Sequence, residues 1–482
     1  MKRLIPLALA LSASPALAKE GMQDGLQRRV AAVLASAGSG IRFGMVVADA
    51  DGHEIVAIDP NGRYIPASNT KLFTTAAAFA TLPGIDAPDT VGGASVRLDA
   101  QDGGVTDVVL VGHGDARLSS AADCLVDCLA TLADAVASNT RQVRDVVGDD
   151  SLFPDQRWSP GMSWNNIPTR SGTAASALTL DDNEVVLKVT PGAVGAPPEV
   201  AGDGYYTIDD RAVSAASGAR GLAFDRAPNT RVLRLTGTIA TSETLRLGVD
   251  DPAERAAWIF AAMLRARGVT VTGAVATRHR PAMPADDPAL RRGSPPARPA
   301  EPAALARLVA PPLAEDLRHT NKVSQNLHAE LLLRRIGRVN GNGSIADGLA
   351  AVRAVLTSAG VPRADYDFSD GSGMSTYNRV VPRGPVIFLR WIAAQPWGAA
   401  WRETLPVGAV DGTLARRFEG TGLERRVFAK TGALNATAAL AGYMIGRGGR
   451  LLTFAIYAND VPETANATRV IDRALELVAA EN

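Results

Sequence analysis

The stretch from about residue 89 to residue 280 constrains the fold of this chain more than any other feature. It consists mostly of short β-like runs broken by Gly, Asp and Asn, for example over 107–112, 184–190 and 231–238. At about 100–200 residues per domain, a chain of 482 residues should form two or three domains. We therefore expect one or two β-rich modules inserted between two parts of another domain.

The segment before this stretch predicts a β-hairpin followed by a helix. Residues 41–50 and 54–58 alternate as two strands on either side of an Asp-Gly turn. An apolar run over 68–82 follows, and a Pro-Gly pair ends it.

The segment after the stretch begins with residues 281–303, which contain seven prolines and predict an extended linker or surface loop. The remainder predicts three helices and three strands, the last two strands forming a hairpin around a Gly-rich turn. We expect the helices over 313–336, 345–359 and 465–480, and the strands over 426–431, 438–445 and 451–457.

The first 18 residues have the pattern of a secretory signal peptide. Lys2 and Arg3 form a positive start, 4–11 is apolar, and small residues over 16–18 precede Lys19 as a cleavage site. The apolar run is too short to span a bilayer, and no later segment approaches the ~20 apolar residues that a spanning helix needs. We expect an exported protein without a transmembrane anchor, most simply in a bacterial periplasm.

Charge excludes one class of partner and points to a small set of residues. The 50 basic and 50 acidic residues cancel, so the chain lacks the excess positive charge that sequence-independent nucleic-acid binding requires. A coding bias toward arginine explains why lysines are scarce, and those that remain mark places where arginine would not serve, because arginine cannot lose its proton. Only six lysines occur, at positions 2, 19, 71, 188, 322 and 430.

The only two cysteines, Cys124 and Cys128, lie four residues apart at what reads as the start of an amphipathic helix from Ser119. In a regular helix such a pair has Cβ atoms ~5–6 Å apart, whereas a disulfide needs about 3.5–4.5 Å. Either the turn is distorted and the pair is bridged, or both thiols are free. No histidine is placed to form a metal site with them.

Ser68 and Lys71 open the first predicted helix, just after Pro66. Three residues apart on a helix, they share a face, so the lysine amine can reach the serine hydroxyl that it would deprotonate. The hydroxyl would also lie at a helix N-terminus, whose backbone N–H groups favour negative charge. Without other evidence, the same pair is equally consistent with a serine that caps the helix and a lysine that is exposed to solvent.

Two more polar elements lie in the C-terminal segment. Ser324 and Asn326 flank one residue, which suits a tight bend that presents both side chains to a cleft. Lys430, Thr431 and Gly432 lie on a strand that we expect to be antiparallel and near a sheet edge, where the glycine allows another backbone to approach closely. Taken singly, the first element is only a polar start of a helix, and the second is only a strand interrupted by a glycine.

The order Ser-x-x-Lys, Ser-x-Asn, Lys-Thr-Gly is that of penicillin-binding proteins and class A β-lactamases. The chain most closely resembles the exported D-alanyl-D-alanine carboxypeptidase/endopeptidase family of low-molecular-mass penicillin-binding proteins, peptidase family S13. Ordinary β-lactamases carry the second motif much sooner, whereas this family has two β-rich inserted domains in that gap. Supporting stretches are 148–153, 176–178, 182–183, 370–375, Asn378 and 410–414.

The resemblance implies an α+β fold, in which an antiparallel sheet flanked by helices forms a penicillin-binding/β-lactamase-like domain with β-rich inserted domains. Its catalytic domain would comprise residues 19–88 and 298–482, after a signal peptide over 1–18. The inserted β-rich part would span 89–297, as two nested domains.

The resemblance also implies a reaction at Ser68, which would attack the carbonyl of a terminal D-Ala-D-Ala bond in peptidoglycan and form an acyl-enzyme. Lys71 would be the base, kept neutral by burial and by the positive charge of Lys430. Ser324 would relay the proton to the leaving D-alanine, and Asn326 would orient Lys71 and bind the substrate amide. β-Lactam antibiotics would acylate Ser68 by the same route.

The remaining roles concern substrate binding. Lys430 and Thr431, with Gly432, would hold the terminal carboxylate, and the backbone N–H groups of Ser68 and Ala433 would form the oxyanion hole. The family resemblance implies no cofactor and no metal.

Four further residues are weaker candidates. Asp149 or Asp150 would reach the amino end of a diaminopimelate side chain, unless they only form a turn. Ser372 and Asp411 would line the site or shape loops near it.

Two alternative functions remain. A β-lactamase-like hydrolase of class A would need a deacylating glutamate on a loop after the second motif, and the chain has no candidate between Gly337 and Asp370. A non-catalytic cell-wall-binding scaffold would not need Ser68, Lys71 and the other motif residues to be intact. The residues do not decide between carboxypeptidase and endopeptidase activity, nor the oligomeric state.

Overall fold

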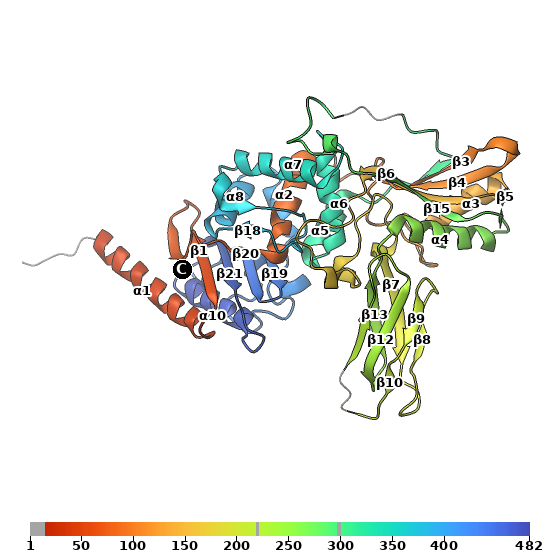
Figure 1. Ribbon diagram of the computed structural model, residues 1–482. Coiled ribbons are helices and arrows are strands. Elements are labelled where there is room, and N and C mark those ends of the chain that lie inside the picture. Colours follow the sequence, from red (N-terminus) through yellow and green to blue (C-terminus); the bar gives the residue numbers. More distant parts are fainter. Residues whose placement is uncertain (1–14, 218–220, 296–299) are drawn as a thin grey trace, which may run out of the picture.

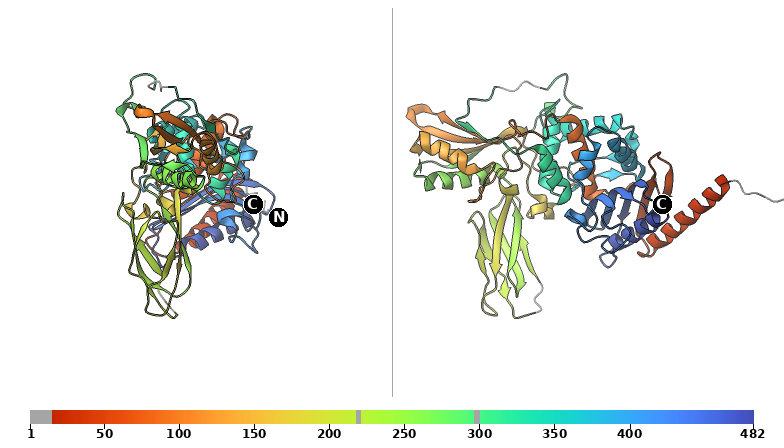
Figure 2. Two further views of the ribbon diagram at one scale, coloured as in Figure 1. Left: turned by 90° about the vertical axis from the view of Figure 1, so that its right-hand side faces the viewer. Right: turned by 180° about the vertical axis from the view of Figure 1, so that it is seen from behind.

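The computed structural model describes residues 15–217, 221–295 and 300–482. Figure 1 shows an α/β body that contains both ends of the described chain, with a second body at its side. A slender third body extends from the second. The view from behind in Figure 2 shows the same arrangement.

The first body is built on a five-stranded sheet in which the two ends of the sequence meet. Neighbouring strands are antiparallel, and Arg42 lies opposite Asn459. Both hairpins predicted from the sequence, over 41–58 and 438–457, are confirmed. In spatial order the strands are β19 (Val427–Leu434), β20 (Thr437–Ile445), β21 (Leu451–Asn459), β1 (Arg42–Ala48) and β2 (Glu54–Ile58).

Each face of this sheet has its own helical layer, because successive strand residues point to opposite sides. Val47 packs against α1 (Pro15–Ala35) and α10 (Ala467–Ala480). Val46 points the other way, into a core shared with α2 (Thr70–Thr81). The remaining helices of that second layer are α5 (Leu313–Lys322), α6 (Asn326–Gly337), α7 (Ile345–Ser358), α8 (Arg383–Ala393) and α9 (Gly398–Glu403). A small two-stranded sheet, β17 (Tyr366–Asp367) with β18 (Arg379–Val380), lies in the same part of the chain.

The prediction of one helical stretch over 313–336 is wrong in one respect, because the stretch is two helices. It breaks at Ser324, whose φ of 63° places it in the left-handed region. Gln325 is extended and caps α6 by accepting a hydrogen bond from the Leu327 N–H. The break produces the bend that the spacing of Ser324 and Asn326 suggests.

The second body has a mixed sheet with two helices against it. β4 pairs in parallel with β6, and β6 with β15, so the strands need crossover connections, which run through α3 and α4. The β-rich prediction for this part did not include α4. A helix was expected near α3, where buried Leu129, Leu132 and Val136 recur at helical spacing. The elements are β3 (Ser95–Ala100), β4 (Thr106–Val111), α3 (Leu129–Asn139), β5 (Gln142–Val143), β6 (Val146–Pro154), α4 (Pro252–Ala266), β14 (Thr270–Val271), β15 (Val275–Arg280) and β16 (Ala306–Arg307).

The third body lies between β6 and α4 in the sequence, and its described residues form only strands, short turns and loops. Its core includes Val185, Leu187, Leu233 and Leu247. Its strands are β7 (Glu184–Thr190), β8 (Glu199–Ala201), β9 (Thr207–Asp210), β10 (Val213–Ser214), β11 (Leu222–Asp225), β12 (Val232–Ile239) and β13 (Glu243–Gly248). The mixed helix and sheet class expected for the chain is confirmed, while the limits of the individual domains stay predictions. The second sheet includes β16, which lies beyond residue 297.

Cys124 and Cys128 form a disulfide, which decides the alternative that the sequence left open. The helix start expected at Ser119 is wrong, because α3 begins only at Leu129. The segment before it is a turn in which Asp127 has a φ of 60°. This non-helical backbone brings the two side chains within reach of each other.

Two predictions fall partly on residues outside the described part of the chain. Of the expected signal peptide, residues 1–14 lie outside it, and the last four residues belong to α1. Of the proline-rich segment 281–303, residues 296–299 lie outside it, and the described remainder contains only the short 3-10 turn Pro284–Asp286. Within the described residues, no helix has the length and apolar character needed to cross a membrane.

Candidate active site

Ser68 lies on a short 3-10 turn, Ala67–Asn69, that leads directly into α2. The first turn of α2 carries Lys71, whose Nζ donates a 3.0 Å hydrogen bond to Oγ of Ser68. Ala67 has a φ of 47°, and Gly373 lies against it: a Cβ on Gly373 would be 1.9 Å from the Ala67 carbonyl oxygen. The strained turn is therefore held in place by a loop that has no side chain at the point of contact.

Lys71 is fully buried and has three hydrogen-bond acceptors. Besides Ser68, Nζ donates to Oδ1 of Asn326 at 2.7 Å and to the carbonyl oxygen of Ser372 at 2.6 Å. Burial lowers the pKa of Lys71 to about 7, although the negative charges of Asp370 and Glu330 oppose that shift. Near neutral pH a large fraction of this amine is therefore unprotonated and able to take a proton from Ser68.

The second motif lies at the bend between α5 and α6. The Ser324 hydroxyl accepts a 2.9 Å hydrogen bond from Nζ of Lys430. Asn326 is the first residue of α6, and its Nδ2 donates 2.9 Å to the carbonyl oxygen of Ser171. Since Oδ1 of the same amide accepts from Lys71, Asn326 connects the buried amine to the inserted part of the chain.

The third motif lies on β19, which is an edge strand as expected. Gly432 is necessary at its position, because a Cβ there would be 2.5 Å from the carbonyl oxygen of Pro66. This close approach lets Nδ2 of Asn69 donate 2.8 Å to the Lys430 carbonyl. Ala433 follows on the same strand and is exposed.

Lys430 is as deeply buried as Lys71. Burial, and in addition the charge of Lys71, hold the pKa of Lys430 well below its usual range. Burial is the largest cause of the lowered pKa of both lysines, and repulsion between the two amines disfavours the state in which both are charged.

Two carboxylates that the sequence analysis did not assign a role support the loop around Ser372. Oε1 of Glu330 accepts from the backbone N–H groups of Gly371 at 3.1 Å and Ser372 at 2.9 Å. Asp370 accepts from two N–H groups further along the loop, those of Gly373 and Ser375. Burial and the neighbouring charge of Asp370 raise the pKa of Glu330.

A sequence signal for Glu330 exists. It follows Asn326 by four residues in a predicted helix, so both side chains lie on one face.

The weaker candidates have separate places in the structure. Ser372 contacts Lys71 through its carbonyl oxygen, as described above. Asp411 accepts a 2.5 Å hydrogen bond from Nζ of Lys322, and its other oxygen accepts from the Val407 N–H. It thereby holds the short loop that carries Thr413, whose hydroxyl accepts a 2.8 Å hydrogen bond from the Thr431 hydroxyl.

Asp149 and Asp150 are not brought to this constellation. Both are buried on β6 in the second body. Asp149 accepts from Arg278 at 3.1 Å, and Asp150 is bonded to His279 at 2.8 Å and to Ser176 at 2.8 Å. These partners belong to none of the three motifs, so the two carboxylates serve an internal polar network in this structure.

Comparisons with known proteins agree with this geometry. The model of the D-Ala-D-Ala carboxypeptidase 3 (S13) family matches residues 26–481. A D-alanyl-D-alanine carboxypeptidase from an Actinomadura species is 35% identical over 480 residues, covering 95% of this chain and 85% of that protein. The carboxypeptidase DacB of Haemophilus influenzae is 26% identical over 333 residues, covering 65% of this chain and 64% of that protein.

Among solved structures, penicillin binding protein 4 from Haemophilus influenzae matches with a TM-score of 0.78 and 21% identity. The match covers 94% of this chain and 98% of that one, so the two share the whole fold. A second structure of that protein, in complex with a β-lactam, matches with a TM-score of 0.72.

Proposed function

Because this chain belongs to the D-Ala-D-Ala carboxypeptidase 3 (S13) family and is a serine-type D-Ala-D-Ala carboxypeptidase, we propose that it works through an acyl-enzyme on Ser68. The observation that carries this assignment is the contact of 3.0 Å between Nζ of Lys71 and the Ser68 hydroxyl. The amine is fully buried and has a pKa of about 7, so it suits a general base at neutral pH.

Acylation requires one proton to move from the nucleophile to the leaving group. Neutral Lys71 accepts the Ser68 proton while Oγ forms a bond to the carbonyl carbon of the penultimate D-alanine. The peptide C–N bond then breaks, and the departing amine of the terminal D-alanine takes a proton from the Ser324 hydroxyl. The proton that Lys71 took from Ser68 returns to Ser324 through Lys430, whose Nζ already donates a hydrogen bond to the Ser324 oxygen, so Lys71 is neutral again before deacylation.

Deacylation uses the same groups in reverse. Lys71 takes a proton from a water molecule, which attacks the ester carbonyl and displaces the Ser68 oxygen. The shortened peptide leaves with a carboxylate, and Ser68 regains its hydroxyl proton. Asn326 and the Ser372 carbonyl keep the amine in place through both steps.

Substrate binding falls to the edge strand. We assign the terminal carboxylate of the peptide to Lys430 and Thr431, and the developing oxyanion to the backbone N–H groups of Ser68 and Ala433. Thr413 supports the Thr431 hydroxyl at 2.8 Å. Peptidoglycan peptides are the expected substrates and β-lactams the expected acylating inhibitors.

The same chemistry extends to cross-linked peptides. We propose that the site also cleaves bonds between D-alanine and diaminopimelate, because the acylating carbonyl is again that of a D-alanine. We further propose that residues 1–18 export the protein to the periplasm. The disulfide between Cys124 and Cys128 supports an oxidising compartment.

Labelling with a fluorescent penicillin tests the nucleophile. The wild-type protein should become covalently labelled, Ser68→Ala should not, and Ser358→Ala, which alters an exposed serine on α7, should label like the wild type. Release of D-alanine from a peptide ending in D-Ala-D-Ala should follow the same order. Equal labelling of wild type and Ser68→Ala would refute the assignment.

A further inference from the structure

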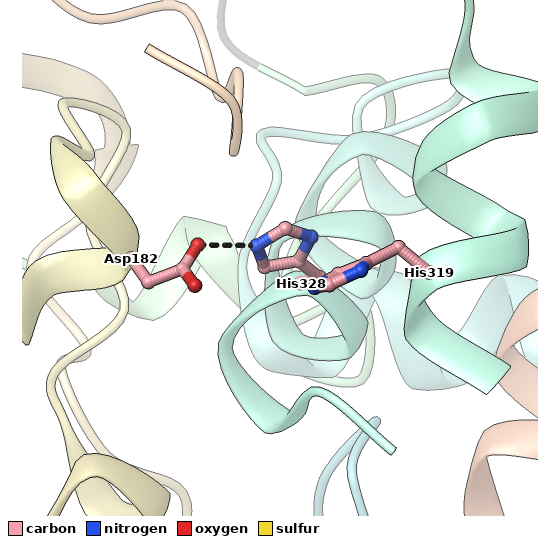
Figure 3. Close-up of side chains that lie close together, drawn as sticks. All are labelled: Asp182, His319 and His328. Carbon is pink, nitrogen blue, oxygen red and sulfur yellow. Dashed lines mark hydrogen bonds and ion pairs between the residues drawn. The ribbon is translucent and has the colours of Figure 1, made fainter. Parts of the chain in front are cut away.

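A cluster of two histidines and an aspartate lies beside the bend of the second motif and has no part in the reaction described above. His319 comes from α5, His328 from α6, and Asp182 from the inserted part of the chain (Figure 3). One possible ligand atom from each residue lies within 4.8 Å of the other two. Two imidazoles and a carboxylate form a donor set that zinc(II) accepts.

His328 is oriented as a metal-binding histidine usually is. Its side chain is 2% exposed, and its Nδ1 is bonded to the buried carboxylate of Asp316. A carboxylate on one ring nitrogen fixes the tautomer and directs the other nitrogen toward a metal. That other nitrogen, Nε2, is hydrogen-bonded to Oδ1 of Asp182 at 2.8 Å, so a zinc ion would replace the proton between them and release it to solvent.

The other two ligands are placed to complete the site. The His319 ring faces that of His328 with centroids 5.0 Å apart, and within the described part of the chain its ring nitrogens have no hydrogen-bond partner. The second oxygen of Asp182 accepts a 3.2 Å hydrogen bond from the Gln325 amide, which orients the carboxylate. Ligand atoms around tetrahedral zinc lie about 3.3–3.5 Å apart. Reaching that spacing requires the Asp182 and His319 side chains to rotate, and both are partly exposed.

Charge and access also fit a divalent cation. Asp182 and Asp316 together supply two negative charges. A cavity of about 400 Å³ adjoins the cluster and leaves room for a water molecule as fourth ligand; among its lining residues are Arg117 and Ser119. The nearby positive charge of Arg117 forms an ion pair with Glu315 at 3.5 Å.

We propose that Asp182, His319 and His328 bind one zinc ion, with a water molecule in the fourth position. His319 and His328 lie on either side of Ser324, and Asp182 belongs to the inserted part of the chain. Bound zinc would therefore tie α5, α6 and the insertion together around the bend that carries the second motif. Asp316 acts as a positioning residue for His328.

Zinc titration of the chelator-treated, redialysed protein tests this proposal, with the metal alone as probe and a chromophoric chelator as competitor. We expect one zinc per chain, a melting temperature that rises with zinc, and affinity at least about tenfold weaker in His319→Ala and Asp182→Asn. Asp182→Asn retains an oxygen facing His328, so it removes the charge with little change in packing. His53→Ala, which alters a histidine in an exposed cluster, should bind zinc like the wild type.

Two results would overturn the proposal: no stoichiometric zinc binding to the wild type, or equal affinity in wild type and His319→Ala. Loss of binding in His53→Ala instead would place the zinc at the exposed cluster and also refute it. Because none of these measurements uses Ser68, the outcome is independent of penicillin labelling.

Discussion

Nζ of Lys71 donates a 2.7 Å hydrogen bond to Oδ1 of Asn326, across 255 positions of sequence. This bond joins the first motif to the second over the entire insertion. The same amide holds the Ser171 carbonyl with its nitrogen, so it is bonded on both sides. The position of the general base thus depends on a residue whose own position depends on the inserted bodies.

Asn326→Ala should slow acylation by penicillin by about 100-fold, because the amine loses a partner that directs it to Ser68. The rate constant of labelling under single-turnover conditions measures this effect. Asn139→Ala, at the exposed end of α3, is the matched control and should react like the wild type. An unchanged rate in Asn326→Ala would show that Lys71 is positioned without it.

The rate of Ser68 acylation should rise with pH through about 7, the pKa of Lys71. Below that pH the buried amine carries a proton and cannot accept another; above it the amine is neutral and acts as a base. Lys71→Arg should be inactive throughout the range, since a guanidinium stays protonated. A rate independent of pH between about 5.5 and 8.5 would contradict Lys71 as the base.

Gly373→Ala should abolish acylation and destabilise the protein, because the new Cβ would lie 1.9 Å from the Ala67 carbonyl. Gly360→Ala is a sharp control: both glycines have positive φ, 89° and 75°, but a Cβ at Gly360 meets nothing within 4 Å. Backbone strain alone would affect both variants alike. Acylation rates and thermal melting should therefore separate the two.

Glu330→Ala should lower the free energy of unfolding by about 2–4 kcal/mol, because two buried N–H groups lose their acceptor. Acylation should slow as well, since those N–H groups belong to Gly371 and Ser372, next to the carbonyl that holds Lys71. Glu330→Gln keeps an acceptor oxygen and should recover most of both losses. Denaturant unfolding and labelling rates check the two effects, and equal behaviour of the two variants would contradict this role.

Replacing both Cys124 and Cys128 with serine should cost at most about 2 kcal/mol of unfolding free energy, because the bridge closes a very short loop. The labelling rate should stay unchanged, since Cys124 and Cys128 precede α3 and belong to none of the three motifs. Denaturant unfolding of the oxidised wild type and the double variant measures the difference. A large drop in labelling would show that this loop affects the site.

The residues that sequence reasoning placed correctly are those whose relationship is local. The contact between Ser68 and Lys71 follows from three-residue spacing on a helix, and the edge position of Lys430 to Gly432 follows from strand alternation. Glu330 was within reach of the same reasoning. The contact of Lys430 with Ser324 was not, because no periodicity relates positions 106 apart.

The misreadings have the same origin. Apolar spacing predicted a helix from Ser119 and an unbroken helix over 313–336. Such spacing cannot reveal a single left-handed residue, and Asp127 and Ser324 are such residues. Backbone geometry of this kind is stabilised by contacts elsewhere in the fold.

The sequence by itself determined which groups this protein has for its chemistry: two serines, two lysines and an amide in a fixed order, with lysine kept where arginine cannot serve. It also determined the helix and strands that carry them, because periodicity is a short-range property of the chain. Only the tertiary structure decided that Lys71 is fully buried with a pKa near 7, and that Glu330, Asp316 and Asp182 lie where they do. Burial and partners exist only after distant segments have packed, and they decide whether an amine is a solvated charge or a base.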